Sequence, residues 1–438
     1  MHITMIGTGY VGLVSGAGLA DFGMQVICVD KDTDRIQCLN RGEIPFYEPG
    51  LEELVERNVK NGRLSFTTDL KMAVENSLVI FVAVGTPDDG QGKTDLSQVE
   101  DVAKRLAQAI DDYKVIVIKS TVPVGTNRRF KEMIQANLKK DIAVDVVSNP
   151  EFLREGSAIE DFMRPNRVVL GSDSAQALAI VKDIYRVLYL IEAPFVSTNL
   201  ETAELIKYAS NAFLATKISF INEVANICEK VGADVHDVAR AMGLDKRIGP
   251  KFLHSGPGYG GSCFPKDTLA FADLGKTLGS PASIVEAVIA VNRSQRARMI
   301  TKIENAIGPL DGKVVGVLGL TFKPNTSDVR ESPALDIVKA LLNQGAQIRA
   351  YDPAGMDEFQ KVVNDEKISY WKNAYEAARG AEALVFLTEW NEFRNLDLKK
   401  LKDALAKPVI LDLRNIYEPE RVTDIGFKYM GVGRGITV

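Results

Sequence analysis

Cysteine is scarce in this sequence: Cys28, Cys38, Cys228 and Cys263 are spread along 438 residues, and no Cys-X-X-Cys pair occurs. A disulfide framework or a zinc cluster is therefore not expected, and we predict no metal site. The same scarcity is typical of proteins that stay in a reducing cytoplasm. Three of the four cysteines lie in strand-like or helical patterns, and we interpret them as core residues. Only Cys263 lies in a context that packing does not explain.

Long apolar runs and an excess of positive charge are also missing. No run is long enough to cross a bilayer, and a strand-like pattern that begins almost at residue 2 argues against a secretory signal. The formal net charge of −5 argues against nucleic acid or an anionic membrane as the main partner. The length of 438 residues gives room for two or three domains. The sequence thus indicates a cytoplasmic protein whose partner is a small molecule.

The N-terminal stretch "MHITMIGTGYVGLVSGAGLADFGMQVICVDKD" reads as strand, turn, helix and strand. Its turn carries a Gly-X-Gly-X-X-Gly pattern, and the second strand ends on Asp30, which is the context that a dinucleotide-binding fingerprint requires. Gly7 permits the tight turn, Gly9 lets backbone approach a pyrophosphate, and Gly12 lets the helix pack on the strand. Asp30 would accept hydrogen bonds from ribose hydroxyls and repel a 2′-phosphate. The predicted cofactor is therefore NAD rather than NADP.

Strand-like and helical patterns continue to alternate after the fingerprint. Three apolar, β-rich runs between residues 77 and 152 each end in small or polar residues, and helical stretches separate them. We predict an α/β fold with a doubly wound, Rossmann-type parallel sheet that has helices on both faces. Ligands bind at the carboxyl ends of such strands, where Thr86, Thr121 and Glu151 lie.

A long helical pattern runs from Glu201 to Val231, and a second one is predicted over about 281–306. The first has apolar residues on more than one face, which suggests a subunit interface as well as a core. Lys207 and Asn211 lie four residues apart, so they share one face of it.

The segment "DGKVVGVLGLTFKPNTSD" starts a second strand–turn–helix–strand unit, whose second strand ends at Asp352. It lacks the full glycine fingerprint, so a second NAD site is doubtful. We predict a nucleotide of another kind there, with Lys323 near its phosphates. We predict three domains: an NAD-binding Rossmann domain at 1–198, a central helical region for dimerisation at 199–306, and a Rossmann-like domain at 307–438.

The stretch "GPGYGGSCFPKD" at 256–267 places Cys263 in a run of four glycines. Glycine lets a ligand approach the backbone closely, and the helix start that follows, together with Lys266, favours the thiolate form of the cysteine. Cys263 is therefore a candidate nucleophile.

Together, these pieces resemble the UDP-glucose 6-dehydrogenase family, one branch of the UDP-glucose/GDP-mannose dehydrogenases, over essentially the full length of the chain. The motifs that carry the resemblance are "GTGYVG", "VGTP", "STVPVGT", "NPEFLREG", "ELIKYASNAFLA", "RIGPKFLHSGPGYGGSCFPKD", "GLTFKPNTSDVRESP" and "YDP". In GDP-mannose enzymes the cysteine loop looks more like "GGSCLPKD", whereas "GYGGSCFPKD" is similar to the UDP-glucose branch.

The resemblance implies an NAD-dependent oxidation of UDP-glucose at C6 to UDP-glucuronate in two steps. Cys263 would hold the intermediate first as a thiohemiacetal and then as a thioester. It implies that the domain at 307–438 binds the UDP-sugar. It also implies a two-fold homodimer in which Arg247 reaches the neighbouring subunit's substrate site.

The predicted site residues fall into three sets. The catalytic set is Cys263, Lys207, Asn211, Asp267, Glu155 and Thr121. The cofactor set joins the fingerprint and strand-end residues to those that match family contacts: Gly7, Gly9, Val11, Gly12, Asp30, Arg35, Thr86, Thr121, Glu155, Lys266 and Arg330. The sugar-nucleotide set is Glu151, Phe152, Leu153, Arg154, Glu155, Lys207, Asn211, Arg247, Phe252, Leu253, His254, Ser255, Gly256, Gly260 and Lys323.

Other interpretations stay open. The chain could be another nucleotide-sugar 6-dehydrogenase. It could also be a single-step hydroxyacid dehydrogenase of the 6-phosphogluconate type, which needs neither a nucleophilic cysteine nor a nucleotide-like C-terminal domain. A non-catalytic NAD-binding redox sensor, with Cys263 as an oxidisable switch, would leave Lys207, Asn211 and Asp267 without a role.

Overall fold

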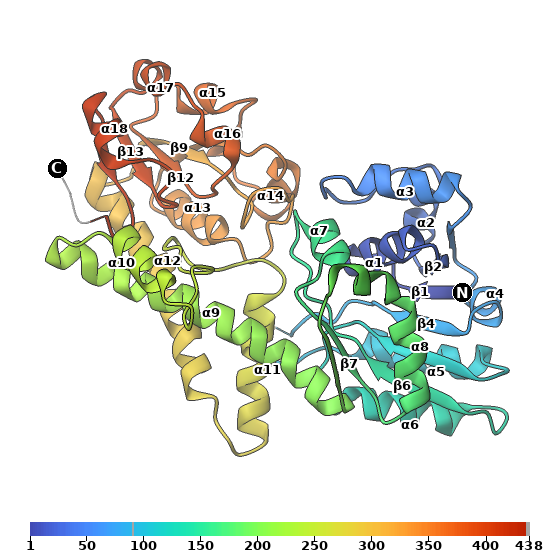
Figure 1. Ribbon diagram of the computed structural model, residues 1–438. Coiled ribbons are helices and arrows are strands. Elements are labelled where there is room, and N and C mark those ends of the chain that lie inside the picture. The colour runs from blue at the N-terminus through green and yellow to red at the C-terminus, as the bar shows by residue number, and fades with distance from the viewer. Residues whose placement is uncertain (90–91, 435–438) are drawn as a thin grey trace. The chain divides into compact units, whose positions relative to one another are not determined.

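The computed structural model describes residues 1–89 and 92–434. Its internal contacts divide the chain into two compact units, unit 1 (Met1–Ser210) and unit 2 (Asn211–Val438) (Figure 1). The three-domain division predicted from the sequence stays a prediction, and residues 435–438 of its third part lie outside the described residues. Within the described ranges, no helix is both long and apolar enough to span a membrane.

Unit 1 is built on an eight-stranded sheet with the strand order β3-β2-β1-β4-β5-β6-β7-β8. The order reverses between β1 and β4, and this reversal creates a crevice at the carboxyl ends of the strands. The strands are β1 (His2–Ile6), β2 (Gln25–Val29), β3 (Leu64–Thr67), β4 (Val79–Val82), β5 (Lys114–Ile118), β6 (Val144–Ser148), β7 (Val168–Gly171) and β8 (Phe195–Thr198).

The predicted parallel sheet is confirmed with one difference. Strand β7 runs antiparallel to β6 and pairs with it only at Ser148 and Gly171, whereas β7 and β8 are parallel to each other. The connection 149–167 holds only one short helix, so the chain does not cross over to the opposite end of the sheet before it enters β7.

Alternation along the strands of unit 1 produces two separate cores. Val79 and Phe81 of β4 belong to one hydrophobic cluster, and Ile80 and Val82 belong to the other. Successive side chains of a strand point to opposite faces, so each face needs its own cover of helices. Figure 1 shows α1 and α3 over one face and α5 and α6 over the other. The helices are α1 (Tyr10–Asp21), α2 (Thr33–Asn40), α3 (Leu51–Lys60), α4 (Leu70–Glu75), α5 (Ser97–Ala109), α6 (Thr126–Asn137), α7 (Ala158–Met163), α8 (Ala175–Ile184) and the 3-10 helix η1 (Arg186–Ile191).

Two long helices occur where the sequence predicts them. Helix α9 (Leu200–Val231) begins in unit 1 and continues in unit 2, and α12 (Ser283–Ile307) lies within unit 2. Ile303 of α12 and Ile221 of α9 share a hydrophobic cluster with strand residues of the second sheet, such as Val315. Unit 2 therefore contains a helical part and a sheet part with a common core.

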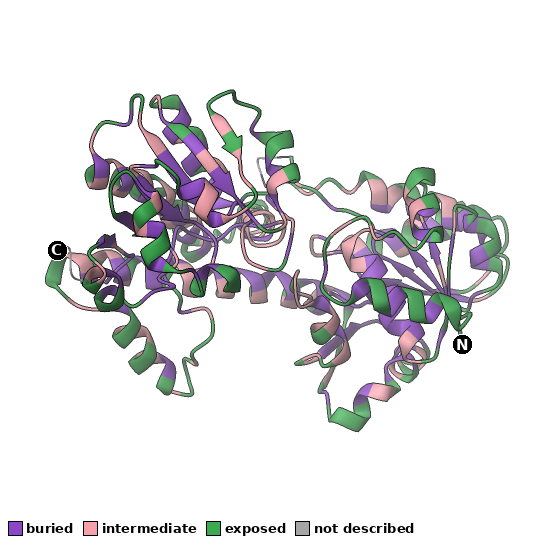
Figure 2. Cartoon of the chain, turned by 90° about the horizontal axis from the view of Figure 1, so that it is seen from above, coloured by how far each residue is buried: buried purple, intermediate pink, exposed green. Residues whose placement is uncertain are grey.

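The second sheet has six parallel strands in the order β11-β10-β9-β12-β13-β14. Figure 2 shows that its strands are mostly buried while the outer faces of the helices are exposed. Its strands are β9 (Val314–Leu318), β10 (Gln347–Tyr351), β11 (Ile368–Tyr370), β12 (Ala383–Phe386), β13 (Val409–Asp412) and β14 (Lys428–Met430). The remaining helices of unit 2 are α10 (Val235–Leu244), α11 (Phe264–Thr277), α13 (Pro333–Asn343), α14 (Met356–Val362), α15 (Ala374–Ala378), α16 (Asn391–Arg394), α17 (Leu398–Ala404) and α18 (Pro419–Asp424).

Asp352, directly after β10, organises the carboxyl edge of this sheet. Its side chain is fully buried and accepts hydrogen bonds from the backbone N–H groups of Leu320 at 2.7 Å and Gly355 at 2.7 Å. The Thr321 hydroxyl and the Trp390 indole N–H donate to the same carboxylate. One carboxylate thus joins the turns after β9, β10 and β12, because it can accept several bonds at once.

Asp352→Asn should destabilise unit 2 by on the order of 3 kcal/mol, because a buried amide has one acceptor oxygen and leaves several donors without a partner. Urea unfolding followed by tryptophan fluorescence measures this change, since the only two tryptophans, Trp371 and Trp390, both lie in unit 2. Asp357→Asn, an exposed change on α14, is the control. Equal unfolding midpoints for the two variants would contradict the role given to Asp352.

Candidate active site

The three glycines of the turn after β1 meet different steric demands. Gly7 has a φ of +95°, and a Cβ there would lie 2.6 Å from the Ala83 carbonyl oxygen. A Cβ on Gly12 would lie 1.9 Å from the carbonyl oxygen of Gly7. A Cβ on Gly9, in contrast, would meet no other atom of the described chain within 4 Å. The turn is therefore tight at Gly7 and Gly12 and open at Gly9, where helix α1 begins and its N-terminus favours an anion.

Asp30 lies at the end of β2, beside this turn. Its carboxylate accepts 2.8 Å hydrogen bonds from both the backbone N–H and the hydroxyl of Thr8, and Arg35 lies 3.3 Å away. Burial by itself would raise the pKa of Asp30, but the bonds from Thr8 and Asp32 and the charge of Arg35 outweigh burial and hold this pKa below its usual value. Asp30 is thus a carboxylate at neutral pH, as ribose recognition requires.

Two of the predicted strand-end residues come together. The Thr86 hydroxyl donates to the backbone oxygen of Thr121 at 2.8 Å. A residue that the sequence analysis missed, Glu204 on α9, holds the turn that follows Thr121 by accepting bonds from the N–H groups of Gly125 at 2.6 Å and Asn127 at 2.7 Å. Burial raises the pKa of Glu204 to about 7. The sequence signal for Glu204 was its position on the buried face of the helix that carries Lys207.

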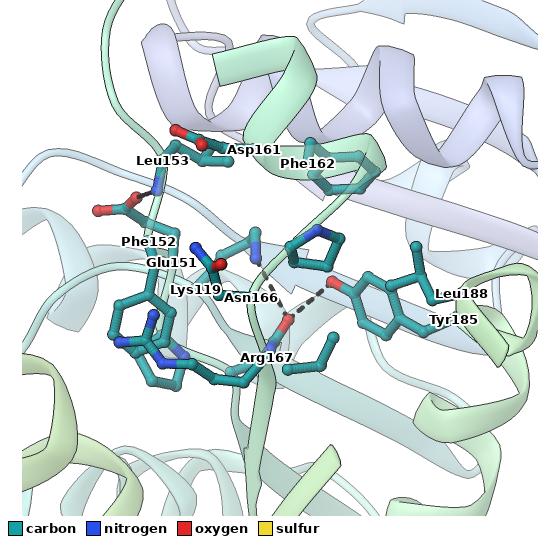
Figure 3. Close-up of a pocket in the computed structure, with 14 residues that line it drawn as sticks. Lys119, Glu151, Phe152, Leu153, Asp161, Phe162, Asn166, Arg167, Tyr185 and Leu188 are labelled. Atoms are coloured by element: carbon teal, nitrogen blue, oxygen red, sulfur yellow. Dashed lines mark hydrogen bonds between the residues drawn. The ribbon is translucent and has the colours of Figure 1, made fainter. Parts of the chain in front are cut away.

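A buried cluster of charges lies at the ends of β5 and β6. The Lys207 ammonium lies 2.8 Å from the Glu151 carboxylate, and both side chains are buried. Burial alone would raise the pKa of Glu151, but Lys207, the Leu153 N–H and Lys119 together lower it, so the carboxylate is ionised. Lys119, Glu151 and Leu153 line a cavity of about 50 Å³, which Figure 3 shows in close-up. Lys119 was not among the residues predicted from the sequence, although a lysine inside the apolar strand run "KVIVIKSTV" was a signal for it.

The rest of the 151–155 segment divides between the cluster and the surface. The guanidinium carbon of Arg167 lies 3.5 Å from the centre of the Phe152 ring. The backbone N–H of Leu153 donates to Glu151 at 2.6 Å. Arg154 is exposed and forms a 2.7 Å ion pair with Asp161.

Glu155 is half-buried. Burial, the hydrogen bond to Glu48 and the negative charges of Glu48 and Glu155 together raise the pKa of the Tyr10 phenol. The turn after Glu155 is held by Glu48, which the sequence analysis also missed. Its carboxylate accepts bonds from the N–H groups of Gly156 and Ala158 and from the Tyr10 hydroxyl. Val11, one residue further into α1, is partly buried against the core.

In unit 2, Cys263 is the N-cap residue of α11 and is half-buried, with its thiol 3.6 Å from the Ser262 hydroxyl. The first turn of α11 also carries Asp267, whose side chain is almost fully buried. Asn211 donates to this carboxylate at 2.6 Å, and the Lys266 ammonium lies 2.6 Å from its other oxygen. The structure therefore brings Asn211, Lys266 and Asp267 together next to the start of the helix that Cys263 caps.

The stretch before Cys263 packs against other parts of unit 2. Phe252 has a φ of +66°, Leu253 is buried and His254 is exposed. The Ser255 hydroxyl donates to the Val432 carbonyl, and the Gly256 N–H donates to the side-chain oxygen of Asn222.

The glycines nearest to Cys263 also have structural reasons to be glycine. A Cβ on Gly260 would lie 2.2 Å from the Glu331 carbonyl oxygen, and a Cβ on Gly261 would lie 2.6 Å from the Phe322 ring. Gly261 also donates its N–H to the Arg330 carbonyl at 3.0 Å. The cysteine loop is thus packed directly on the loop 322–331.

Three predicted basic residues of unit 2 have local partners. Lys323 lies with its ammonium 5.1 Å from the Phe322 ring centre, and Arg330 pairs with Asp328 at 2.8 Å. Arg247 forms a 2.6 Å ion pair with Asp245 and has an 89% exposed side chain. All four cysteines are free. In the described part of the chain, no group of three or more His, Cys, Asp or Glu side chains is placed to hold a metal ion.

Three domain models of one family match the chain. The NAD binding domain of the UDP-glucose/GDP-mannose dehydrogenase family matches residues 1–189, its central domain matches 201–294 and its UDP binding domain matches 316–419. These matches confirm the resemblance seen in the motifs, and the first of them confirms the predicted NAD cofactor.

Relatives and solved structures agree with these matches. The chain is 53% identical to UDP-glucose 6-dehydrogenase of Rhizobium meliloti, over 99% of this chain and 100% of that protein. It is 49% identical to UDP-glucose 6-dehydrogenase TuaD of Bacillus subtilis, over 99% and 93% of the two chains. The structure of a UDP-glucose dehydrogenase from Pyrobaculum islandicum superimposes with a TM-score of 0.92 at 38% identity, covering 99% of this chain and 97% of that one. That of a UDP-D-ManNAc dehydrogenase from Pyrococcus horikoshii superimposes with a TM-score of 0.87 at 26% identity, covering 99% and 100%.

Asp30→Ala should reduce the preference for NADH over NADPH by roughly tenfold, because it removes an acceptor for the ribose hydroxyls and the charge that repels a 2′-phosphate. The readout is the ratio of the two dissociation constants, measured by nucleotide fluorescence. Asp32→Ala is the matched control, since it removes a neighbouring carboxylate that caps α2 and leaves Asp30 in place. If the ratio stays unchanged in Asp30→Ala, another residue discriminates between the cofactors.

Proposed function

The chain belongs to the UDP-glucose/GDP-mannose dehydrogenase family, and we propose that it oxidises UDP-glucose at C6 to UDP-glucuronate in two NAD-dependent steps. The observation that carries this proposal is the start of α11, where Cys263 caps the helix and the buried Asp267 holds Asn211 one turn away. The names of the two relatives described above support the choice of substrate. The proposed location is the cytoplasm, in keeping with four free thiols.

Unit 1 fits the cofactor. The open space at Gly9, the start of α1 and the ionised Asp30 are what a dinucleotide's pyrophosphate and ribose require. Val11, Arg35, Thr86 and Arg330 remain proposed cofactor contacts. When bound, NAD accepts one hydride from C6 in each of the two oxidations.

The UDP part of the substrate is assigned to the domain at 307–438, whose residues 316–419 match the family's UDP binding domain. Lys323 is the proposed phosphate partner. The residues that follow β6 and the stretch 252–256 are assigned to the sugar nucleotide, and the boundaries 1–198, 199–306 and 307–438 are kept as the proposed domain division.

In the first oxidation, the C6 hydroxyl loses its proton while a hydride leaves C6. Lys207 is assigned to the oxygen that becomes anionic, where its ammonium stabilises negative charge electrostatically, and Asn211 donates a hydrogen bond to the same oxygen. Glu155 and a water held by Thr121 are the proposed proton acceptors.

The second half of the reaction is covalent. The Cys263 thiolate adds to the aldehyde carbon, a C–S bond forms, and the oxygen takes up a proton to give a thiohemiacetal. Loss of that proton and of a second hydride gives a thioester. Water then adds to the thioester carbonyl, the C–S bond breaks, and the carboxylate and the regenerated thiolate form as the two protons of the water pass to solvent. The covalent link keeps the reactive aldehyde from leaving the enzyme.

We also propose a two-fold homodimer built on α9. Four apolar side chains of this helix, spaced by seven, seven and four residues, are 48–69% exposed: Phe213, Phe220, Ile227 and Val231. Side chains with this spacing share one face of a helix, and exposed apolar faces of this kind mark association surfaces. Arg247, paired only with a neighbour two residues away among the ion pairs described, is assigned to the partner's substrate site.

Complete turnover should release two NADH for each UDP-glucose consumed, because a thiol that holds an acyl group permits a second oxidation. Absorbance at the NADH band and chromatography of the nucleotide sugars give the ratio.

Cys263→Ser should retain less than about a tenth of the acid-forming rate and bind NAD normally, since an alcohol is a much weaker nucleophile at neutral pH. Release of one NADH together with free aldehyde would point instead to a single-step dehydrogenase. If the enzyme turned over another nucleotide sugar but not UDP-glucose, the assigned substrate would be wrong.

Mixing two inactive variants tests the shared site. A Cys263→Ala chain keeps a good Arg247, and an Arg247→Ala chain keeps a good Cys263. One site of a mixed dimer then has both groups, so subunit exchange should restore up to about half of the wild-type activity per mixed dimer. Native mass spectrometry confirms exchange. No recovery in exchanged dimers would show that Arg247 serves its own chain.

A further inference from the structure

Lys119 is a buried ammonium with a neutral hydrogen-bond acceptor. It follows β5 in unit 1, is 5% exposed, and donates to the side-chain oxygen of Asn149 at 3.3 Å. The Tyr185 hydroxyl donates to the same oxygen at 2.8 Å, and the Asn149 amide donates to the Val169 carbonyl at 2.9 Å. Figure 3 shows Lys119 and Tyr185 converging on this acceptor. Asn149 therefore fixes the position of the Lys119 charge.

The neighbours of Lys119 make this charge consequential. Glu151 and Lys207 both interact electrostatically with it, and burial together with Lys207 lowers its pKa to about 8 despite the opposing effect of Glu151. Of the other charged groups around this cavity, Asp161 pairs with Arg154, and Arg167 packs on the Phe152 ring, whose centre also lies 5.4 Å from the Lys207 ammonium. Lys119 and Glu151 line the same cavity, and the Lys207 ammonium lies 2.8 Å from Glu151, so two ammonium groups lie near one carboxylate.

The net charge of this cluster determines how well it stabilises an oxyanion. A lone Lys207–Glu151 pair is neutral as a whole, and the carboxylate cancels much of the field that the ammonium would exert on developing negative charge. A second buried cation leaves the cluster with a net positive charge, which is what stabilises an oxyanion in a low-dielectric site.

We propose that Lys119 is a positioning residue that keeps Glu151 ionised and gives the Lys119–Glu151–Lys207 cluster its net positive charge, and so sets the protonation of Lys207 during catalysis. The proposal rests on the proposed function, in which Lys207 stabilises the oxygen at C6.

The first residue of β5 offers a matched control. Lys114, at the first residue of β5, is 1% exposed and forms a 2.5 Å ion pair with Asp112. Lys114 begins β5 and Lys119 directly follows it, so both buried lysines belong to one short segment, and Lys119 is the one that interacts with Glu151 and Lys207. A purely structural role for Lys119 predicts that removing either lysine has the same kind of effect.

The experiment compares Lys119→Met, Lys119→Gln and Lys114→Met with the wild type. Glutamine keeps a hydrogen-bond donor toward Asn149 but removes the positive charge. Lys119→Gln therefore provides the measurement if Lys119→Met does not fold. In protein labelled with 15N-lysine, the Lys207 Nζ signal, assigned with Lys207→Arg, is titrated by NMR. Removing a nearby positive charge makes a group hold its proton more tightly, so the Lys207 pKa should rise by about one unit or more in the Lys119 variants and stay unchanged in Lys114→Met.

The pH profile of kcat is the second readout. Its acidic and basic limbs should both move to higher pH in the Lys119 variants, whereas Lys114→Met should change thermal stability without moving either limb. The proposal is overturned if the Lys207 titration stays in place, or if kcat falls by one constant factor at every pH. A wild type that releases one NADH would refute the proposed function, and the NMR titration would still decide the electrostatic role of Lys119.

Discussion

In each unit, a carboxylate at the end of the second strand holds the turn after the first strand, and the arrangement of the loops at the carboxyl edge of the sheet depends on it. Asp30 accepts from the Thr8 N–H and hydroxyl, and Asp352 accepts from the Leu320 N–H and the Thr321 hydroxyl. The surroundings differ: the Asp30 side chain is 10% exposed beside an open glycine, whereas Asp352 is fully enclosed and also takes the Trp390 N–H. One local arrangement therefore leaves a carboxylate available to a ligand in unit 1 and uses it entirely for structure in unit 2.

The sequence contained the local part of this architecture. Glycine spacing and strand-like runs are short-range signals, so the fingerprint, the ends of β4 and β5, and helices α9 and α12 could be predicted. The candidate site was partly accessible in the same way. Cys263 stood out because four glycines closely precede it, and the helical spacing of Lys207 and Asn211 gave them a common face. Family motifs supplied the remaining assignments, which no alternation or helical period contains.

What the sequence could not supply were partners from distant segments. Hydrophobic alternation predicts that β5 is buried. It does not predict that Lys119, directly after β5, donates to Asn149, or that Glu204 accepts bonds from the start of α6, 77 residues away. Glu48 was hidden for the same reason, since its three donors come from Tyr10 and from the turn at 156–158. The antiparallel entry of β7 likewise depends on where the connection 149–167 lies, which is a tertiary outcome. Gly260 shows a further limit, because close packing against Glu331 demands glycine whether or not a ligand approaches it.

The contact of the cysteine loop with the loop 322–331 has a consequence for protein engineering. A Cβ at Gly260 would collide with Glu331, and a Cβ at Gly261 would collide with Phe322. The two loops are therefore sterically complementary to each other. Chimaeras that exchange nucleotide-binding C-terminal segments between relatives at a junction near residue 310 would combine the cysteine loop of one protein with the 322–331 loop of another. Recombination that changes nucleotide preference therefore has to transfer residues 256–263 and 322–331 as one block, even though almost sixty residues of chain separate them.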